Sequence, residues 1–192
     1  MKIKLYFALL CLFLSVGIKA QDAAVKTNLL SDATMTMNVG VEIGLKPRWT
    51  VDLSGELNAW NVSRSSTWKH WMAQPELRFW FCDRFIGHFL GFHVHGGQYN
   101  LGNLNNGVKF LGTDFSKLSD YRYQGWFAGA GIGYGYSWIL NERWNLEAEI
   151  GLGYSYTRYE KYPCADCGDL EEKGDHHYVG VTKAALNLIY VF

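Results

Sequence analysis

Side chains alternate along much of the chain between an apolar or aromatic set and a set of glycines and polar residues. From residue 125 to residue 138 the even-numbered side chains run from Trp126 to Trp138 without a charged group, and the odd-numbered ones are mostly glycines. From residue 144 to residue 157 the same alternation sets Trp, Leu, Ala, Ile and Tyr against a face that carries Glu147 and Glu149. A period of two is that of a β-strand. The chain is therefore predicted to be all-β.

The polar faces of these strands contain glycines and carboxylates with few lysines, which is unusual for a surface in water. A barrel in lipid has the opposite arrangement to a soluble protein, with its apolar face outside and its polar face inside. No apolar run after residue 20 approaches the roughly 20 residues that a membrane-spanning helix needs. The pattern predicts an eight-stranded, antiparallel, up-and-down transmembrane β-barrel. A soluble barrel or sandwich with an aromatic core is the alternative.

Short and long connections alternate between the predicted strands. Tight turns are expected at residues 46–48, 83–85 and 140–143, and longer connections at residues 61–69, 100–122 and 160–176. Short turns at one end and long loops at the other are typical of outer-membrane barrels and place both termini of the mature chain at the periplasmic end. The eight predicted strands are Val25–Ser31, Met37–Leu45, Trp49–Trp60, His70–Cys82, Ile86–Tyr99, Tyr123–Ile139, Trp144–Tyr159 and His177–Phe192.

Aromatic residues recur twelve positions apart on the apolar faces, as Trp126 and Trp138 do. Twelve residues of a strand tilted by roughly 40° rise on the order of 30 Å, close to an apolar band about 25 Å tall with aromatic girdles at both edges. The predicted girdle residues are Trp49, Trp71, Trp126, Trp138, Trp144, Tyr156, Tyr178, Tyr190 and Phe192.

The first twenty residues are typical of a secretory signal peptide, with Lys2 and Lys4 before an apolar stretch and Ala20 at the expected cleavage site. Residues 21–192 would then form one mature domain. Lipidation at Cys11 is the weaker alternative, because Leu10 precedes it. Loss of three lysines leaves 15 basic residues against 18 acidic ones, so no nucleic-acid partner is expected.

Charged residues on the polar faces are predicted to point into the barrel and form ion pairs. Eight strands leave an interior only wide enough for side chains to fill, which favours a polar plug over a selective pore. The predicted interior charges are Lys26, Glu42, Asp52, Glu56, Glu76, Arg78, Glu147, Glu149 and Lys183.

Cys164 and Cys167 are expected to form a local disulfide in an oxidising exterior. With His176 and His177 they could instead bind a metal, although adjacent histidines rarely point at one ion. Cys82 is expected to be an unpaired thiol. No cofactor or metal is predicted.

Histidines offer two further possibilities. His93 and His95 share a strand face and could reach His70 if the register allows, although separate interior histidines are the commoner outcome. An enzyme that modifies lipid A would need His, Ser and an acid to converge on the lipid-facing surface. The only outward histidine expected is His88, with no serine two residues away on its face. No catalytic residue is therefore predicted.

The alternation of Leu186, Leu188, Tyr190 and Phe192 resembles the C-terminal strand signal by which outer-membrane barrels are recognised by the barrel assembly machinery. With other segments along the mature chain, it resembles a family of small outer-membrane proteins of unknown function from Bacteroidetes-type bacteria, some encoded near fimbrial assembly genes. The resemblance implies the eight-stranded barrel of OmpA-like proteins and no reaction. The segments that carry it are residues 26–30, 38–42, 74–80, 125–129 and 162–168.

The expected role is a non-enzymatic one in the outer membrane, structural or in contacts with surface proteins, and the resemblance links it to fimbria-type surface assembly. Membrane lipids and the barrel assembly machinery are the expected partners. A small-ligand binder at the barrel mouth and a lipid-A-modifying enzyme are the two alternatives.

Overall fold

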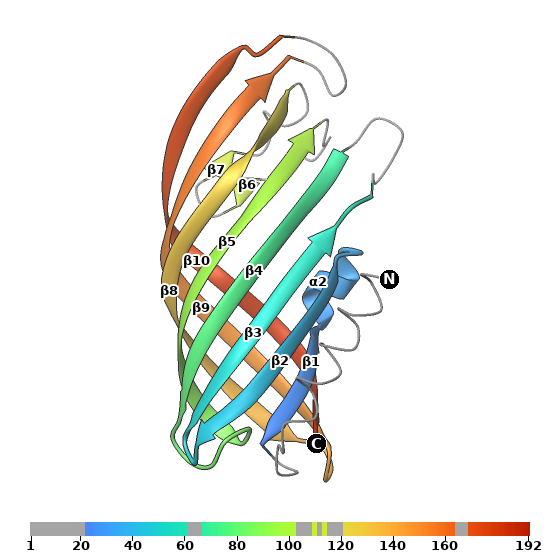
Figure 1. Cartoon of the computed structure of the whole chain (residues 1–192), viewed down its shortest axis with the longest axis vertical. Helices are drawn as coiled ribbons and strands as arrows, with labels where there is room; N and C mark the ends of the chain where they lie inside the picture. Colours follow the sequence, from blue (N-terminus) through green and yellow to red (C-terminus); the bar gives the residue numbers. More distant parts are fainter. Residues whose placement is uncertain (1–21, 61–66, 103–108, 111–112, 115–120, 164–168) are drawn as a thin grey trace, which may run out of the picture.

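Eight antiparallel strands form a closed barrel in a computed structural model (Figure 1). Around the ring the order is β1-β10-β9-β8-β5-β4-β3-β2, so barrel strands that follow one another along the chain are neighbours, and β1 pairs with β10 to close the ring. The expected all-β, up-and-down antiparallel fold is thereby confirmed. The structure describes residues 22–60, 67–102, 109–110, 113–114, 121–163 and 169–192. The barrel strands are β1 (Ala23–Asn28), β2 (Met37–Lys46), β3 (Trp49–Asn58), β4 (Thr67–Trp80), β5 (Gly87–Gly102), β8 (Arg122–Ile139), β9 (Trp144–Tyr162) and β10 (Glu172–Val191).

A short hairpin and a short helix are not part of the barrel wall. A hairpin of β6 (Lys109–Phe110) and β7 (Thr113–Asp114) lies in the connection between β5 and β8. The helix α2 (Leu29–Ala33) follows β1, so the prediction that this strand continues to Ser31 is wrong. Asn28 ends the strand because its side-chain oxygen accepts a hydrogen bond from the amide of Leu30 at 3.1 Å, which caps the first turn of the helix.

Other strand ends differ from the predicted ones by a few residues. β4 starts at Thr67 and stops at Trp80, β5 continues to Gly102, and β10 starts five residues earlier than predicted, at Glu172. Pairing with a long neighbouring strand extends each of these strands beyond the part that shows clear alternation. The tight turns were predicted correctly and lie together at one end of the barrel, where β1 begins and β10 ends (Figure 1).

The wall is low at β1 and high at β10. The strands lengthen from 6 residues in β1 to 10 in β2 and 20 in β10. β1 pairs with β10 only between residues 187 and 191 of the latter. The Asn28 side chain continues this ladder, because it accepts from the amide of Leu186 at 3.1 Å and donates to the carbonyl of Ala184 at 3.5 Å. Asn28 therefore joins the top of the short strand to the tall one.

A bulge in β10 changes which side chains face outward. The register with β9 shifts between Val181 and Lys183. Below this shift the odd-numbered residues of β10 point inward, and above it the even-numbered ones do. Tyr178 lies opposite Ser155, which is buried on the interior face, so its prediction as an outer girdle residue is wrong. His177 takes the outward place and lies opposite Tyr156.

Aromatic side chains fill the barrel at its short-turn end. The rings of Trp80 and Phe89 are fully buried and 4.7 Å apart, and Phe85 lies 6.1 Å from Trp80. Ala24 and Ile189 complete this cluster. Trp80 and Phe89 have the same strand parity as Arg78 and His93, so this inward set could have been found by extending the alternation.

Candidate functional site

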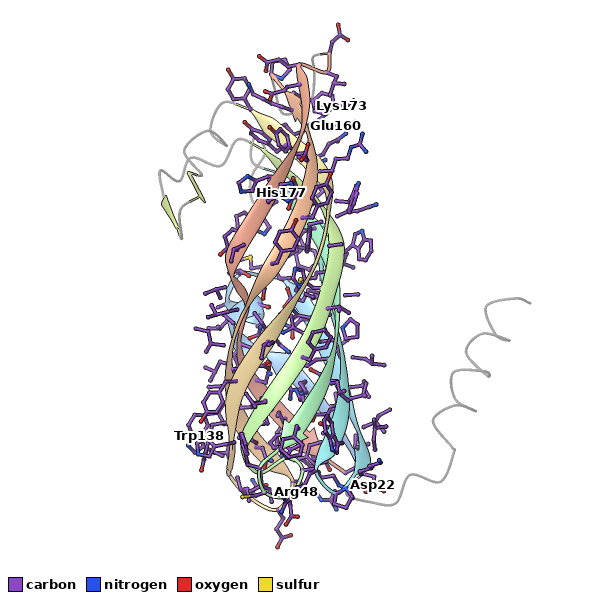
Figure 2. All side chains as sticks on the ribbon, turned by 90° about the vertical axis from the view of Figure 1, so that its left-hand side faces the viewer. Asp22, Arg48, Trp138, Glu160, Lys173 and His177 are labelled. Carbon is purple, nitrogen blue, oxygen red and sulfur yellow. The ribbon has the colours of Figure 1, made fainter. Side chains whose placement is uncertain are left out.

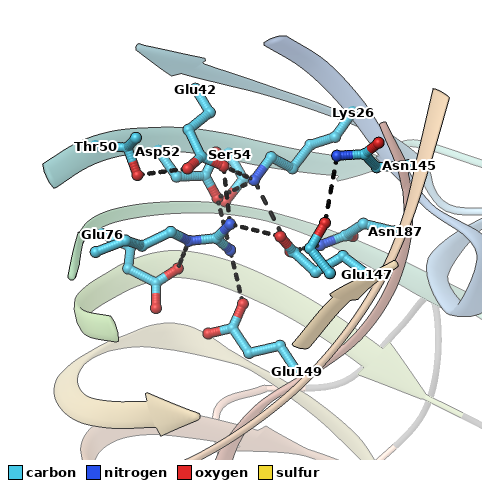
Figure 3. A network of polar contacts seen from close by, with 12 residues as sticks. Lys26, Glu42, Thr50, Asp52, Ser54, Glu76, Asn145, Glu147, Glu149 and Asn187 are labelled. Carbon is cyan, nitrogen blue, oxygen red and sulfur yellow. Dashed lines mark hydrogen bonds and ion pairs between the residues drawn. The ribbon is translucent and has the colours of Figure 1, made fainter. Parts of the chain in front are cut away.

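A network of charged side chains, which includes Glu42, Glu76 and Glu147, lies inside the barrel (Figure 3). Arg78 is at the centre of this network. Its side chain has no exposed surface, and it donates hydrogen bonds to four carboxylates at distances of 2.7 to 3.0 Å. Two of these acceptors belong to β9, on the other side of the lumen from β4. The guanidinium thus links opposite walls of the barrel. The four carboxylates are those of Glu42, Glu76, Glu147 and Glu149.

Two lysines complete the positive part of the network. Lys26 of β1 forms an ion pair with Glu42 and lies 3.4 Å from a carboxylate oxygen of Asp52. Lys183 of β10 lies 2.5 Å from Glu76 and 3.1 Å from Glu149. Since the bulge in β10 lies just before Lys183, the same irregularity that reverses parity also sets the position of this ammonium group. Six of the eight barrel strands contribute a charged residue.

Neutral side chains connect this network to the aromatic cluster below it. The Trp80 indole donates to the Thr50 hydroxyl at 2.9 Å, and that hydroxyl donates to Glu42 at 2.5 Å. The Arg78 guanidinium lies 4.5 Å from the centre of the Phe89 ring. The charge network and the aromatic cluster therefore form two adjoining layers of side chains inside the barrel.

Glycine provides the room that the carboxylates need. A Cβ atom at Gly91 would lie 1.7 Å from an oxygen of Glu76, and one at Gly133 would lie 2.5 Å from an oxygen of Glu149. The glycine-rich inward faces of β5 and β8 are thus required by the size of the interior side chains. Small residues on β5 and β8 thus accommodate charged side chains of the adjacent strands β4 and β9.

Five carboxylates and three cations give the network a formal charge of −2. One oxygen each of Asp52, Glu76 and Glu149 is buried without a hydrogen-bond partner among the described residues. A cavity of about 170 Å³ adjoins the network and is lined in part by Lys26, Asp52 and Lys183. It has room for several water molecules but lies below the roughly 300 Å³ typical of a ligand pocket.

The structure brings together eight of the nine predicted interior charges. The exception is Glu56, which is only partly buried and accepts a hydrogen bond from the Ser31 hydroxyl at 2.7 Å instead. Asn145 and Asn187 also point into the lumen beside the network, on the same strand faces as Glu147 and Lys183, and the alternation of side chains gives this orientation. Asn187 donates to Glu147 at 2.8 Å.

The histidine cluster that was considered as an alternative does not form. The rings of His93 and His95 are 5.9 Å apart inside the barrel, but His70 pairs with Tyr99, several residues further along β5. His93 instead contacts the Thr182 hydroxyl at 2.9 Å. Within the described part of the chain, no three His, Cys, Asp or Glu side chains are grouped as metal ligands.

Two histidines face outward rather than one. His88 contacts the hydroxyl of Tyr134 at 2.6 Å, and His177 contacts that of Tyr154 at 2.5 Å. The bulge in β10 explains why the second was missed. Cys82 is exposed with a free thiol, as predicted, whereas Cys164 and Cys167 lie outside the described residues, as does the segment 1–20.

Apolar side chains cover the outer wall between two aromatic rows. Ile132, Leu152 and Val179 are more than half exposed, at 64%, 61% and 81%. Trp138 lies towards the short-turn end and His177 towards the opposite end in Figure 2. The remaining predicted girdle side chains are partly or largely exposed, namely Trp49, Trp71, Trp126, Trp144, Tyr156, Tyr190 and Phe192. No helix in the described residues has the length and apolar character to cross a bilayer.

A family model described as a protein of unknown function, DUF3575, matches residues 6–192. The comparison with curated proteins gives no significant match. The matched range includes every strand of the barrel and all the residues of the charge network. The chain therefore belongs to the DUF3575 family of proteins of unknown function.

Proposed function

We propose that this chain is an integral outer-membrane barrel with a closed lumen and a non-enzymatic, structural or surface-interaction role. The observation that carries the proposal is the distribution of polarity across the wall. Carboxylates, lysines and an arginine lie inside, and side chains such as Ile132 and Leu152 lie outside. In water this arrangement would expose a large apolar surface, whereas in a bilayer each face has a suitable environment.

The charge network supports a structural role. Its hydrogen bonds cross the lumen between β4 and β9, and the side chains that make them are buried. Neither outward histidine forms a hydrogen bond to a serine among the described residues, and both instead contact tyrosines. These contacts favour a stiff membrane body over a lipid-modifying enzyme.

The tall side of the barrel is the surface proposed for contacts with other proteins. β8, β9 and β10 continue beyond Trp126, Tyr156 and His177 as polar strands, and Glu160 and Lys173 form an ion pair there at 2.6 Å (Figure 2). The proposal includes removal of residues 1–20, assembly by the barrel assembly machinery, and a relation to OmpA-like barrels of Bacteroidetes-type bacteria with a role in fimbria-type surface assembly.

The membrane part of the proposal is tested by expressing the full chain in a Gram-negative host. The expected product begins at Gln21, fractionates with the outer membrane and needs detergent to stay folded and monodisperse. A folded, monodisperse mature chain in detergent-free buffer would exclude the membrane location.

The interaction role is tested with a variant in which Asn-Gly replaces residues 161–172. Since Glu160 and Lys173 are paired neighbours, a two-residue turn can join them without disturbing the barrel. Surface adhesion or partner recovery should fall while folding and membrane insertion stay unchanged. Full adhesion by the shortened barrel would contradict the role.

A further inference from the structure

A groove crosses the outer wall just beyond the upper aromatic row. Its volume is about 680 Å³, and it extends over β3, β4, β5, β8 and β9. Trp71 and Trp126 lie along its lower side, and both are outward-facing. Lys69 of β4 and Arg158 of β9 also line it. In the membrane orientation proposed above, on which this inference rests, the groove lies at the level of the outer headgroups.

The two cations of the groove have no acidic partner in the part of the chain that the structure describes. Strand register places Lys69 opposite Asn100, and Arg158 opposite Trp126 on one side and Asp175 on the other. The Asp175 carboxylate lies 3.5 Å from the His177 ring and forms no ion pair with Arg158. Lys69 and Arg158 belong to strands three steps apart, and each step is about 4.8 Å, so they are separated by on the order of 15 Å. Two positive charges at that separation suit a ligand with an anionic group at each end.

The acidic residue of the groove is already neutralised. Glu160 accepts hydrogen bonds from Gln124 at 3.1 Å and from Tyr162 at 3.0 Å. It also forms an ion pair with Lys173 at 2.6 Å. The bonds from Lys173, Gln124 and Tyr162 lower the pKa of Glu160 to about 2. Glu160 is therefore ionised and held by Lys173 and does not compete for Lys69 or Arg158.

Between the cations the groove has the chemistry that binds sugars. Gln98 lines the groove and accepts a hydrogen bond from the Trp71 indole at 3.2 Å, which leaves its amide hydrogens available as donors. The side-chain oxygen of Asn100 is buried without a hydrogen-bond partner among the described residues. Amide groups beside exposed indole rings can bind sugar hydroxyls and the apolar faces of sugar rings.

We infer that this groove binds a phosphorylated glycolipid of the outer leaflet, with Lys69 and Arg158 on its phosphates and Gln98 and Asn100 on its sugars. The acyl chains would then lie along the apolar wall below Trp71 and Trp126. Charge-assisted hydrogen bonds to phosphate are the strongest contacts available at such a surface.

The test uses the mature chain reconstituted in phosphatidylcholine nanodiscs that contain a bis-phosphorylated disaccharide lipid. Glycolipid that stays bound after detergent exchange is counted by native mass spectrometry. The double variant Lys69→Gln, Arg158→Gln should retain about tenfold less of it. The matched control, Lys46→Gln with Arg48→Gln at the opposite rim, should retain as much as the wild type.

Three further arms identify the ligand. Retention should fall when the phosphates of the glycolipid are removed, and phosphatidylglycerol should be retained no better by the wild type than by the double variant. Inorganic phosphate should not displace the glycolipid. Equal retention by the double variant and the control, equal retention of dephosphorylated lipid, or displacement by inorganic phosphate would overturn the inference. Failure of the wild-type chain to enter the nanodisc would instead refute the membrane proposal.

Discussion

Replacement of Arg78 by methionine tests whether the interior network stabilises the barrel. The change keeps much of the side-chain volume but removes four hydrogen bonds to carboxylates, of 2.7 to 3.0 Å, from a site with no exposed surface. Five carboxylates would then share two lysines. Removal of one partner from a buried ion network costs roughly 3–5 kcal/mol, because the remaining charges are left uncompensated. Arg78→Met should therefore lower the folding equilibrium constant by about two to four orders of magnitude.

The assay is urea unfolding in lipid vesicles, followed by tryptophan fluorescence. Arg48→Met is the control, since Arg48 is exposed at the short-turn end and should change stability by less than about 0.5 kcal/mol. Adding Glu149→Gln to Arg78→Met should recover about 1–2 kcal/mol, because the surplus negative charge is reduced. A loss below about 1 kcal/mol for Arg78→Met, or no recovery in the double variant, would refute the reasoning.

Two further substitutions and one measurement on the wild-type protein test the same geometry. Asn28→Ala should cost about 1–2 kcal/mol in urea unfolding, because it removes the helix cap and the link to β10; a change within about 0.3 kcal/mol would contradict that role. Gly91→Ala should cost about 1–3 kcal/mol by displacing Glu76, whereas Gly55→Ala, whose Cβ would have no contact shorter than 3.7 Å, should be nearly neutral. Wild-type protein in planar bilayers should show no discrete conductance steps, and such steps would disprove a closed lumen.

Most of the barrel could be predicted from the sequence because its two faces differ so strongly in polarity. The alternation of apolar residues with glycines and carboxylates identifies strands, their number and their inward faces without knowledge of any partner. The same parity, extended by two residues from Arg78 and by four from His93, would have found Trp80 and Phe89. Parity failed at one place, above the bulge in β10, where Tyr178 and His177 exchange faces.

The network itself could be predicted only as a set of inward charges. Which carboxylates surround Arg78 depends on how strands from opposite sides of the ring are staggered, and that stagger is a property of the closed barrel. Glu56 has the right parity but lies too far along β3 to join the network, and it contacts Ser31 of α2 instead.

The order of residues along the chain determined the all-β class, the eight strands and their polar interior, since a two-residue period acts within each strand by itself. Tertiary structure alone decided the low wall at β1, the bulge before Lys183 and the groove between Lys69 and Arg158. These features join residues far apart in sequence, and their positions depend on the register around the whole ring, which no single strand encodes.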